Sequence, residues 1–400
     1  MAKQVESLFL NLGPDLGPKL EPTPEDDSAL SPHHTTGILP SQALRGLVGE
    51  GVIASAEALA PGQIQPASLD LRLGGVAYRV RASYLPGSSH TVRQKIEAIG
   101  MHEVDLSGGA VLERGAVFIV PLQEELRLKK GLSGVANPKS STGRLDIFTR
   151  LITDYATQFD RVTAQYKGPL YVEISPRTFT IVVREGSRLI QLRLRRGHPP
   201  ATAAGTRRLH ERVSLIQDED DGDTLDERIS SDVPVSVDLR GDPETGIVGY
   251  KARAHTGLID VDAVGAYDAA DFWEPIPANE SRTLTLDPNA FYILASKEAV
   301  TVPPDHAAEM APFNPLHGEF RVHYAGFFDP GFGHSESGGA GSRAVLEVRS
   351  YEVPFLLEDG QTVGRLVYER LTETPDVVYG AQLGSSYQRQ GLKLSKHFRQ

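Results

Sequence analysis

The sequence contains no cysteine, and this absence removes several kinds of chemistry at once. Disulfide bonds, thiol nucleophiles and zinc sites built on cysteine are all excluded. Because a chain without cysteine is compatible with a reducing compartment, we expect a cytoplasmic protein. The sequence also lacks any run of eighteen apolar residues and starts without a basic-then-apolar signal pattern, so we expect no membrane association.

Basic residues are outnumbered by acidic ones. Lys and Arg total 41 against 52 Asp and Glu, which gives a formal net charge of −11. Such a balance disfavours nonspecific binding to a phosphate backbone, so we expect no nucleic-acid partner. A local basic pocket for a small anion is still compatible with it.

Long helical segments are scarce. The 39 glycines and 27 prolines favour turns and short strands. Apolar runs that alternate with period two, such as SLDLRLG, GAVFIVPL, GPLYVEIS and RLIQLRLRRG, predict a mainly β fold. One short helix is expected in TTGILPSQALRGLVGEG, with Ser41 as its N-cap. A chain of 400 residues is long enough for two domains.

The second half of the chain repeats the first at a constant interval of 174 residues. The matched residues are Ala116 and Ala290, Glu124 and Glu298, Pro138 and Pro312, Glu173 and Glu347, Gly186 and Gly360, and Leu192 and Leu366. One interval held over about 75 residues indicates duplication of a single β domain, with a repeat too long for a solenoid.

We therefore expect four parts. A proline-rich, flexible N-terminal arm covers 1–35, and the first repeat covers 36–215. An acidic linker around QDEDDGDTLDE covers 216–244. The second repeat, ending in a polar tail, covers 245–400. Each repeat is expected to form a β barrel or sandwich.

A compact polyanion-binding cluster is expected in NPKSSTGRLD. Lys139, Ser140, Ser141, Thr142 and Arg144 supply two cations and three hydroxyls within six residues. Hydroxyls and backbone N–H groups bind phosphate oxygens, and an arginine can hold two of them at once. The alternative is an exposed turn whose hydroxyls cap a neighbouring segment. The segment is not a P-loop, because the glycines and the lysine of that motif are missing.

Each repeat carries one glutamate within an apolar strand. Glu173 lies in PLYVEIS and Glu347 in AVLEVRS. Burial would raise the pKa of such a carboxylate towards that of a useful general base. The alternative is a structural pair with an arginine, such as Arg144 or Arg349.

Two further segments suit a nucleotide site. Asp329 opens the turn Asp-Pro-Gly, where a sugar hydroxyl or a metal-bound phosphate could approach the carboxylate. The polar C-terminal tail, with Tyr387, Gln390 and Lys393, could fold over a bound nucleotide. The alternatives are an ordinary hairpin tip and an ordinary frayed terminus.

Taken together, these segments resemble the dCTP deaminases, which are trimeric β proteins related to dUTP diphosphatases. The segment 139–144 followed by Glu173 resembles their R-S-S-x-x-R…L-E signature, and IQPASLDLRLG resembles their early strand. DPGFG at 329–333 resembles their D-P-G hairpin, and YQRQG at 387–391, with the residues up to Ser395, resembles their tail. The closest fit is a long, duplicated bacterial form with two tandem dUTPase-like domains.

The resemblance implies hydrolysis of dCTP to dUTP and ammonia without zinc. The zinc deaminase pattern H-x-E…P-C-x-x-C cannot exist in a chain without cysteine. The resemblance implies a glutamate as the base, with Glu173 as the first candidate and Glu347 as the second. It implies that Ser140, Ser141 and Arg144 hold the water and the triphosphate, and that Mg²⁺ is bound through the triphosphate.

Each repeat lacks something that the other has. The first repeat reads DYATQFDRVTAQYKG where the family has its D-P-G hairpin, and the second reads FNPL at 313–316 in place of the serines and arginine. Because the family's sites lie between subunits, we expect a composite site that uses both copies in a homo-oligomer. A trimer is favoured by analogy, and dTTP is a candidate effector.

Three other functions stay open. A dUTP diphosphatase, or a bifunctional enzyme, would use the same fold and release pyrophosphate. A nucleotide-binding module with decayed sites would bind without turnover.

Overall fold

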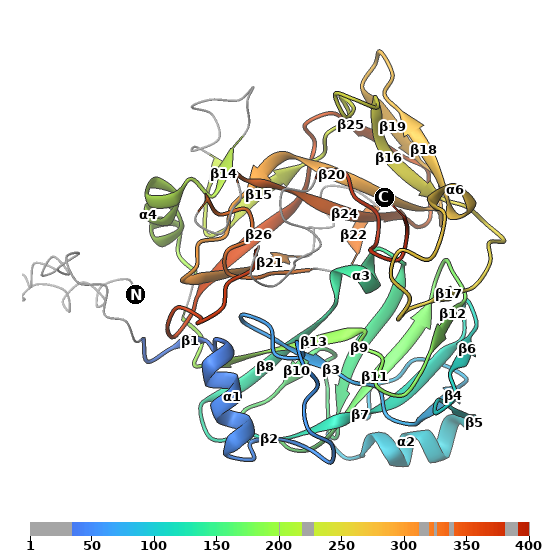
Figure 1. Ribbon diagram of the computed structural model, residues 1–400, viewed down its shortest axis with the longest axis vertical. Coiled ribbons are helices and arrows are strands. Elements are labelled where there is room, and N and C mark those ends of the chain that lie inside the picture. The colour runs from blue at the N-terminus through green and yellow to red at the C-terminus, as the bar shows by residue number, and fades with distance from the viewer. Residues whose placement is uncertain are drawn as a thin grey trace, which may run out of the picture. The chain divides into compact units, whose positions relative to one another are not determined.

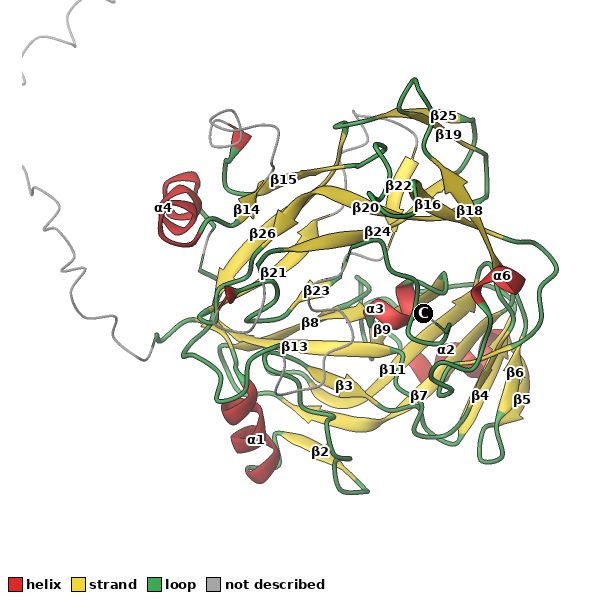
Figure 2. Ribbon diagram, turned by 45° about the horizontal axis from the view of Figure 1, so that its top comes forward, coloured by secondary structure: helices red, strands yellow, loops and turns green. Residues whose placement is uncertain are grey.

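Strands make up most of the secondary structure, as the alternating apolar pattern predicted, and helices α1 and α4 lie outside the sheets (Figure 2). The computed structural model describes residues 34–199, 201–217, 228–311, 320–323, 326–335, 340–380 and 391–399. Residues 1–33 of the arm expected at 1–35, the segment 313–316, and Tyr387 and Gln390 of the tail lie outside the described residues.

The N-terminal half holds two main sheets (Figure 1). One has the order β1-β13-β8-β10 with β3 beside β13, and the other has the order β5-β4-β7-β11-β9 with β2 beside β7. A smaller sheet joins β6 and β12 to β17. The elements are β1 Gly37–Ile38, α1 Ser41–Gly49, β2 Ile53–Ser55, β3 Leu69–Leu71, β4 Val76–Val80, α2 Val92–Ile99, β5 Gly100–Asp105, β6 Ala110–Leu112, β7 Val117–Arg127, β8 Leu132–Pro138, α3 Ser140–Gly143, β9 Ile147–Thr153, β10 Arg161–Val162, β11 Lys167–Pro176, β12 Ile181–Val183, β13 Ile190–Arg196 and α4 Ala203–Val213.

The C-terminal half has the same plan. Its sheets have the orders β15-β26-β21-β23 and β18-β16-β20-β24-β22, with β14 beside β20, and a third pairs β19 with β25. The elements are β14 Ile216–Gln217, β15 Val233–Ser236, β16 Ile247–Ala252, β17 Ile259–Asp260, α6 Ala269–Phe272, β18 Trp273–Pro277, β19 Thr283–Leu286, β20 Phe291–Val300, β21 His306–Ala311, β22 Phe320–His323, β23 Phe327–Phe328, β24 Ser342–Ser350, β25 Phe355–Glu358 and β26 Thr362–Arg370.

Strand register repeats along the chain with the interval found in the sequence. In β11 and β7, Glu173 lies opposite Ile119, and in β24 and β20, Glu347 lies opposite Ile293. Adding 174 to the first pair gives the second. The β8–β13 and β21–β26 pairs obey the same rule, since Leu192 lies opposite Ala136 and Leu366 lies opposite Met310. The two halves therefore share strand register as well as strand order.

Alternation along β11 and β24 divides each strand between two environments. Leu170, Val172 and Ile174 of β11 enter the main core of the first repeat, while Tyr171 faces a separate cluster with Val92 and Ile96 of α2. In β24, Leu346 and Val348 enter the core of the second repeat.

The other face of β24 packs against the first repeat. Val345 belongs to the same core cluster as Phe179 of the first repeat and Phe398 of the C-terminal segment. Trp273 of β18 lies in this cluster too, with its ring 5.5 Å from that of Phe179 and 6.0 Å from that of Phe398. The equivalent sheet faces therefore pack against different partners. In the first repeat this face packs against α2, and in the second repeat it packs against the first repeat.

Two local expectations differ from the structure. The N-cap of α1 is Pro40 and Ser41 is its first helical residue, because the Ser41 hydroxyl donates to the Asp376 carboxylate at 2.5 Å instead. The range 216–244 is not all linker, since it includes β14 and β15. Its apolar positions Val233 and Val235 are fully buried, and the acidic run falls within 218–227, outside the described residues. In the described part of the chain, no helix is long and apolar enough to span a membrane.

The hydrogen bonds of Glu124, one of the residues matched by the repeat, predict that its removal lowers the stability of the fold. Its buried carboxylate accepts hydrogen bonds from Gln63 Nε2 at 2.7 Å, the Arg72 backbone N–H at 2.9 Å and Arg72 Nε at 2.7 Å. Glu124→Ala leaves buried donors and the Arg72 charge uncompensated, so we expect a loss of about 3–5 kcal/mol in the free energy of unfolding. Urea denaturation followed by circular dichroism measures it.

Glu50→Ala is the matched control for this change. Glu50 forms an exposed ion pair with Lys129 at 2.6 Å, and an exposed pair contributes about 0–1 kcal/mol. Equal midpoints for the two variants would show that the Glu124 network does not stabilise the fold.

Candidate active site

The cluster at 139–144 forms the connection between β8 and β9. Ser140–Gly143 make the single turn α3, whose backbone is closed by hydrogen bonds from Thr142 and Gly143 N–H to the Lys139 carbonyl at 2.8 and 2.9 Å. Ser141 and Thr142 are buried, whereas Ser140 is partly exposed. The structure thus holds these hydroxyls in one fixed turn.

Arg144 follows α3 and reaches the C-terminal segment. Its guanidinium is buried, and Nη1 donates to the backbone carbonyl of Lys393 at 3.0 Å. Figure 1 shows the C-terminal end of the chain near α3, between the two halves. Arg144 also acts electrostatically on Glu347 of the second repeat.

Glu347 is the acid of the second repeat that faces this arginine. It is only 6% exposed, and burial raises its pKa from 4.5 to about 8. Arg144 opposes this shift, and the nearby Asp146 carboxylate adds to it. The pKa of Glu347 therefore lies close to neutral pH.

A buried ion pair lies close to Arg144 and Glu347. Arg349, two residues after Glu347, forms an ion pair with Asp146, two residues after Arg144, and both side chains are buried. Arg349 Nη2 also donates to Thr178 Oγ1 at 2.9 Å. Residues that follow α3 thus meet residues of β24 across the boundary between the repeats, while the composite site itself stays a prediction.

Glu173 has different surroundings. Burial raises its pKa, and the Ser83 side chain, Arg150 and the Tyr84 backbone oppose this shift. Asp160 lies in the same region, where burial raises its pKa to about 7 and Glu173 adds to the effect. Arg144 is not among the groups that act on Glu173. The assignment of the base to Glu173 therefore stays a prediction, and the geometry of the described residues favours Glu347.

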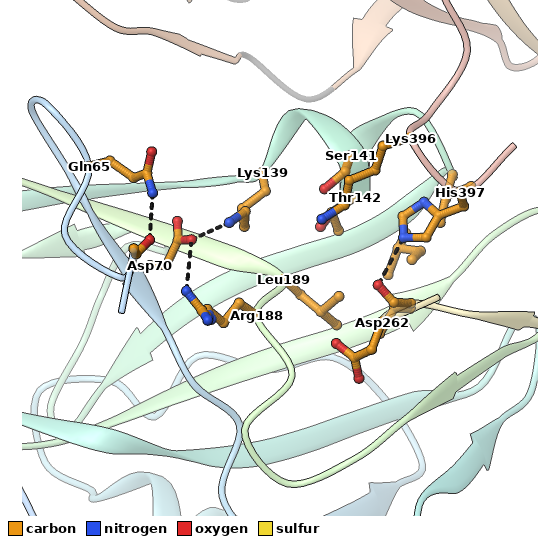
Figure 3. Close-up of a pocket in the computed structure, with 14 residues that line it drawn as sticks. Gln65, Asp70, Lys139, Ser141, Thr142, Arg188, Leu189, Asp262, Lys396 and His397 are labelled. Atoms are coloured by element: carbon orange, nitrogen blue, oxygen red, sulfur yellow. Dashed lines mark hydrogen bonds and ion pairs between the residues drawn. The ribbon is translucent and has the colours of Figure 1, made fainter. Parts of the chain in front are cut away.

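A cavity of about 260 Å³ lies on the other side of α3. Lys139, Arg188 and Lys396 line it together with Ser141 and Thr142 of α3, and Figure 3 shows Lys139 and Arg188 directed towards Asp70. The remaining residues that line it include Gln65, Asp70, Leu189, Asp262 and His397.

Asp70 holds the cations at one end of this cavity. Its buried carboxylate pairs with Lys139 and lies 3.9 Å from Arg188 Nη1. The other oxygen, Oδ1, has no hydrogen-bond partner among the described residues. Burial lowers the pKa of Lys396, and Lys139 adds to this effect. Three cations around one cavity make it suitable for a polyanion.

Asp329 of the D-P-G turn reaches the same region from the second repeat. It pairs with Arg193 of β13 at 3.3 Å. Burial raises the pKa of Asp329, and the charges of both Asp70 and Lys139 act on it. Asp329 therefore lies within electrostatic reach of Asp70 and Lys139, and its substrate-binding role stays a prediction.

Sequence reasoning missed several residues of this site, namely Asp70, Arg188, Arg193, Lys396 and His397. Asp70 could have been found, because it lies in the SLDLR strand that carries part of the family resemblance. The others have no local motif. Among the described residues, no group of three or more acidic or histidine side chains could hold a metal ion.

Comparison with known proteins gives the family. The family model described as the 2′-deoxycytidine 5′-triphosphate deaminase N-terminal domain matches residues 35–198, and the corresponding C-terminal domain matches 202–398. This chain belongs to the dCTP deaminase family. The family and enzyme class expected from the sequence motifs are confirmed.

Individual members of the family agree with this placement. The chain is 57% identical to a dCTP deaminase of Agrobacterium tumefaciens of known crystal structure, with a TM-score of 0.79 over 84% of this chain and 100% of that one. It is 28% identical over 162 residues to the "dCTP deaminase, dUMP-forming" of Methanobrevibacter smithii, which is 39% of this chain and 76% of that protein. The protein of the same description from Halobacterium salinarum is 35% identical over 109 residues, 26% of this chain and about half (51%) of that relative.

The raised pKa of Glu347 predicts a pH-dependent stability. Between its unfolded value near 4.5 and its folded value of about 8, the folded chain binds more protons than the unfolded chain. This contribution to stability is therefore full below pH 4.5 and is lost as pH rises towards 8. We expect Glu347→Gln to remove this slope, so that the variant is the more stable protein above pH 8. Urea midpoints from pH 5 to pH 9 test this.

Glu352→Gln, at an exposed position two residues after β24, serves as the control and should keep the wild-type slope. An unchanged slope in Glu347→Gln would contradict the shifted titration.

Proposed function

We propose that this chain catalyses the hydrolytic deamination of dCTP to dUTP and ammonia. The observation that carries the proposal is the buried Glu347, with its pKa of about 8, within electrostatic reach of Arg144 at the exit of α3. A carboxyl group with this proton affinity can accept and return a proton at neutral pH. The family membership of both halves and the dUTPase-like fold that the sequence motifs imply support the same assignment.

In the proposed mechanism Glu347 is the general base. Its carboxylate takes a proton from the water that attacks C4 of cytosine, so that a C4–O bond forms. The carboxyl then passes the proton to the pyrimidine ring. After a second proton moves from the new hydroxyl to the amino group, the C4–N bond breaks and ammonia leaves. Ser140, partly exposed at the start of α3, is proposed to hold the water, and Arg144 to steady the carboxylate.

The triphosphate is proposed to occupy the cationic cavity. Lys139, Arg188 and Lys396 supply charge, and Ser141 and Thr142 line the same wall. Lys393, on the C-terminal segment, lies close to Arg144 and is proposed as a further contact to the triphosphate. Tyr387 and Gln390 keep the substrate-binding role that the resemblance implies.

Mg²⁺ is proposed to arrive with the triphosphate. The Asp70 carboxylate fits this, because one of its oxygens has no protein partner among the described residues while the other is taken by Lys139. One carboxylate plus substrate phosphates is the usual way in which Mg²⁺ is held. The ion would screen the charge of the triphosphate.

A second candidate function is the bifunctional reaction that goes on to dUMP. It is favoured by the relatives from Methanobrevibacter smithii and Halobacterium salinarum, which are both described as dUMP-forming. Incubation with dCTP, with ammonia and pyrophosphate measured together, separates the choices. With dCTP as substrate, ammonia alone supports the proposed reaction, and ammonia together with pyrophosphate supports the bifunctional one. If dCTP gives neither product but dUTP, supplied instead, releases pyrophosphate, the protein is a diphosphatase. Binding of dCTP with neither product would indicate a non-catalytic module.

Three wider expectations are part of the same proposal, namely a cytoplasmic location, a homo-oligomer with a trimer favoured by family analogy, and dTTP as an effector.

The base assignment predicts the effect of a matched pair of variants. Glu347→Gln keeps the shape of the side chain and removes its basicity, so we expect deamination to fall about 100-fold or more while dCTP still binds. Glu173→Gln is the control, because its strand position is equivalent and its surroundings are not. Ammonia release and calorimetric binding measure the two effects. A dead Glu173 variant beside an active Glu347 variant would assign the base to the first repeat.

The phosphate assignment predicts a binding effect. Arg188→Gln removes a charged contact worth about 1.5–3 kcal/mol, so we expect KM for dCTP to rise about 10- to 100-fold with a smaller change in kcat. Lys129→Gln removes a cation in an exposed pair outside the cavity and should leave KM unchanged. Steady-state kinetics at saturating Mg²⁺ compares them. If both variants keep the wild-type KM, the cavity does not bind the triphosphate.

A further inference from the structure

A buried hydrogen-bond chain ties the C-terminal segment to α3. His397 Nε2 lies 2.8 Å from the Val261 carbonyl oxygen, and its Nδ1 lies 2.9 Å from Ser395 Oγ. Ser395 Oγ lies 2.9 Å from the carbonyl oxygen of Ser141. His397 is 2% exposed and Ser395 is fully buried. These contacts connect the segment after β17, the tail and the turn that carries the proposed phosphate-binding hydroxyls.

The hydrogen-bond chain contains three contacts, but a neutral imidazole and the Ser395 hydroxyl together supply only two hydrogens for them. The two ends are carbonyl oxygens, which only accept, so Nε2 must carry a hydrogen for Val261. A neutral His397 then has a bare Nδ1, and the single Ser395 hydroxyl hydrogen faces two acceptors. An imidazolium removes the conflict, because Nδ1–H donates to Ser395 Oγ and the hydroxyl donates to Ser141. Each of the three contacts then holds its own hydrogen.

Burial opposes that protonation when no anion is bound. Burial lowers the pKa of His397, and the adjacent Lys396 adds to the effect, while Asp262 and Asp260 act against it. Both aspartates are already paired with Arg184, at 2.9 and 2.8 Å.

Other charged groups line the same cavity. Lys139 and Arg188 lie on its wall, and Asp70 faces both of them. A bound triphosphate would add several negative charges there and would favour the imidazolium.

We propose that His397 is a positioning residue that takes up a proton when a triphosphate enters the cavity, and so locks the tail onto α3. The inference rests on the proposed function, since it places the triphosphate among Lys139, Arg188 and Lys396. Neither ring nitrogen of His397 is available to the ligand, so the residue acts through Ser395 and Ser141. Because only a polyanion supplies the necessary charge, the lock responds to the phosphate chain and not to the base.

Calorimetry tests this without turnover. Magnesium-saturated inorganic tripolyphosphate is titrated into the full chain near pH 6.5 in two buffers of different ionisation enthalpy, which gives the number of protons exchanged on binding. Protonation of the tripolyphosphate itself contributes equally to every variant. We expect the wild type to take up a fraction of a proton, up to one, more than His397→Gln does. Deoxycytidine, which has no phosphate, should produce no such difference.

Two further variants make the result specific. Ser395→Ala removes the acceptor for Nδ1–H while keeping the ring, so the extra uptake should also fall. Arg399→Gln changes the same tail at a residue whose side chain donates only to the Ala266 carbonyl among the described residues, and it should behave as the wild type. In dCTP kinetics, His397→Gln should raise KM several-fold and change kcat less, and the KM difference from wild type should grow as pH falls.

The outcomes separate the two proposals. Binding of tripolyphosphate with equal proton uptake in the wild type and His397→Gln overturns the lock and leaves the phosphate site intact. No binding of tripolyphosphate to the wild type overturns the phosphate assignment, and the lock with it. Should His397→Gln fail to fold, equal uptake in the wild type and Ser395→Ala would still overturn the lock.

Discussion

A buried ion pair between Asp146 and Arg349 fixes how the two repeats meet, and two residues before each partner lie Arg144 and Glu347, which interact electrostatically. Charged groups lose their hydration when they are buried, and they recover this free energy only in a precise geometry. Residues two apart on the exit of α3 therefore face residues two apart on β24, and a one-residue slip would turn Glu347 and Arg349 to the opposite face of the sheet. The aromatic cluster around Trp273 adds apolar burial to the same contact. The proposed composite site depends on this register.

The two repeats hold equivalent glutamates in one chain, and the surroundings of these glutamates differ. Glu173 and Glu347 have the same strand register, and burial raises the pKa of both. The sheet face of Glu173 is covered by α2 and by the segment with Ser83 and Tyr84, whereas that of Glu347 meets Arg144. Strand position alone cannot distinguish the two, because the difference comes from what covers each face.

The sequence could predict what is local or repeated in it. The strands, the interval of 174 residues and the turn at 139–144 depend on nearby residues, and the structure has all three. The covering of Glu173 depends on a segment about ninety residues earlier in the chain, and no pattern in PLYVEIS reports it. Arg188 and Lys396 lie in unremarkable sequence, and only the fold brings them to Asp70 and Lys139. Even Ser41, an ideal N-cap by its local sequence, is drawn to a distant partner, Asp376.

The C-terminal segment links the two ends of the proposed site through α3. Arg144, at the exit of α3, donates to the Lys393 carbonyl, and Ser395 donates to the carbonyl of Ser141 within the turn. Lys396 and His397 then line the cavity on the other side. A displacement of the segment would therefore disturb the neighbour of Glu347 and the cationic wall together. Since an enzyme gains from holding the reacting groups in a fixed arrangement, a segment that orders both ends at once would make the binding of the phosphates help to position the base.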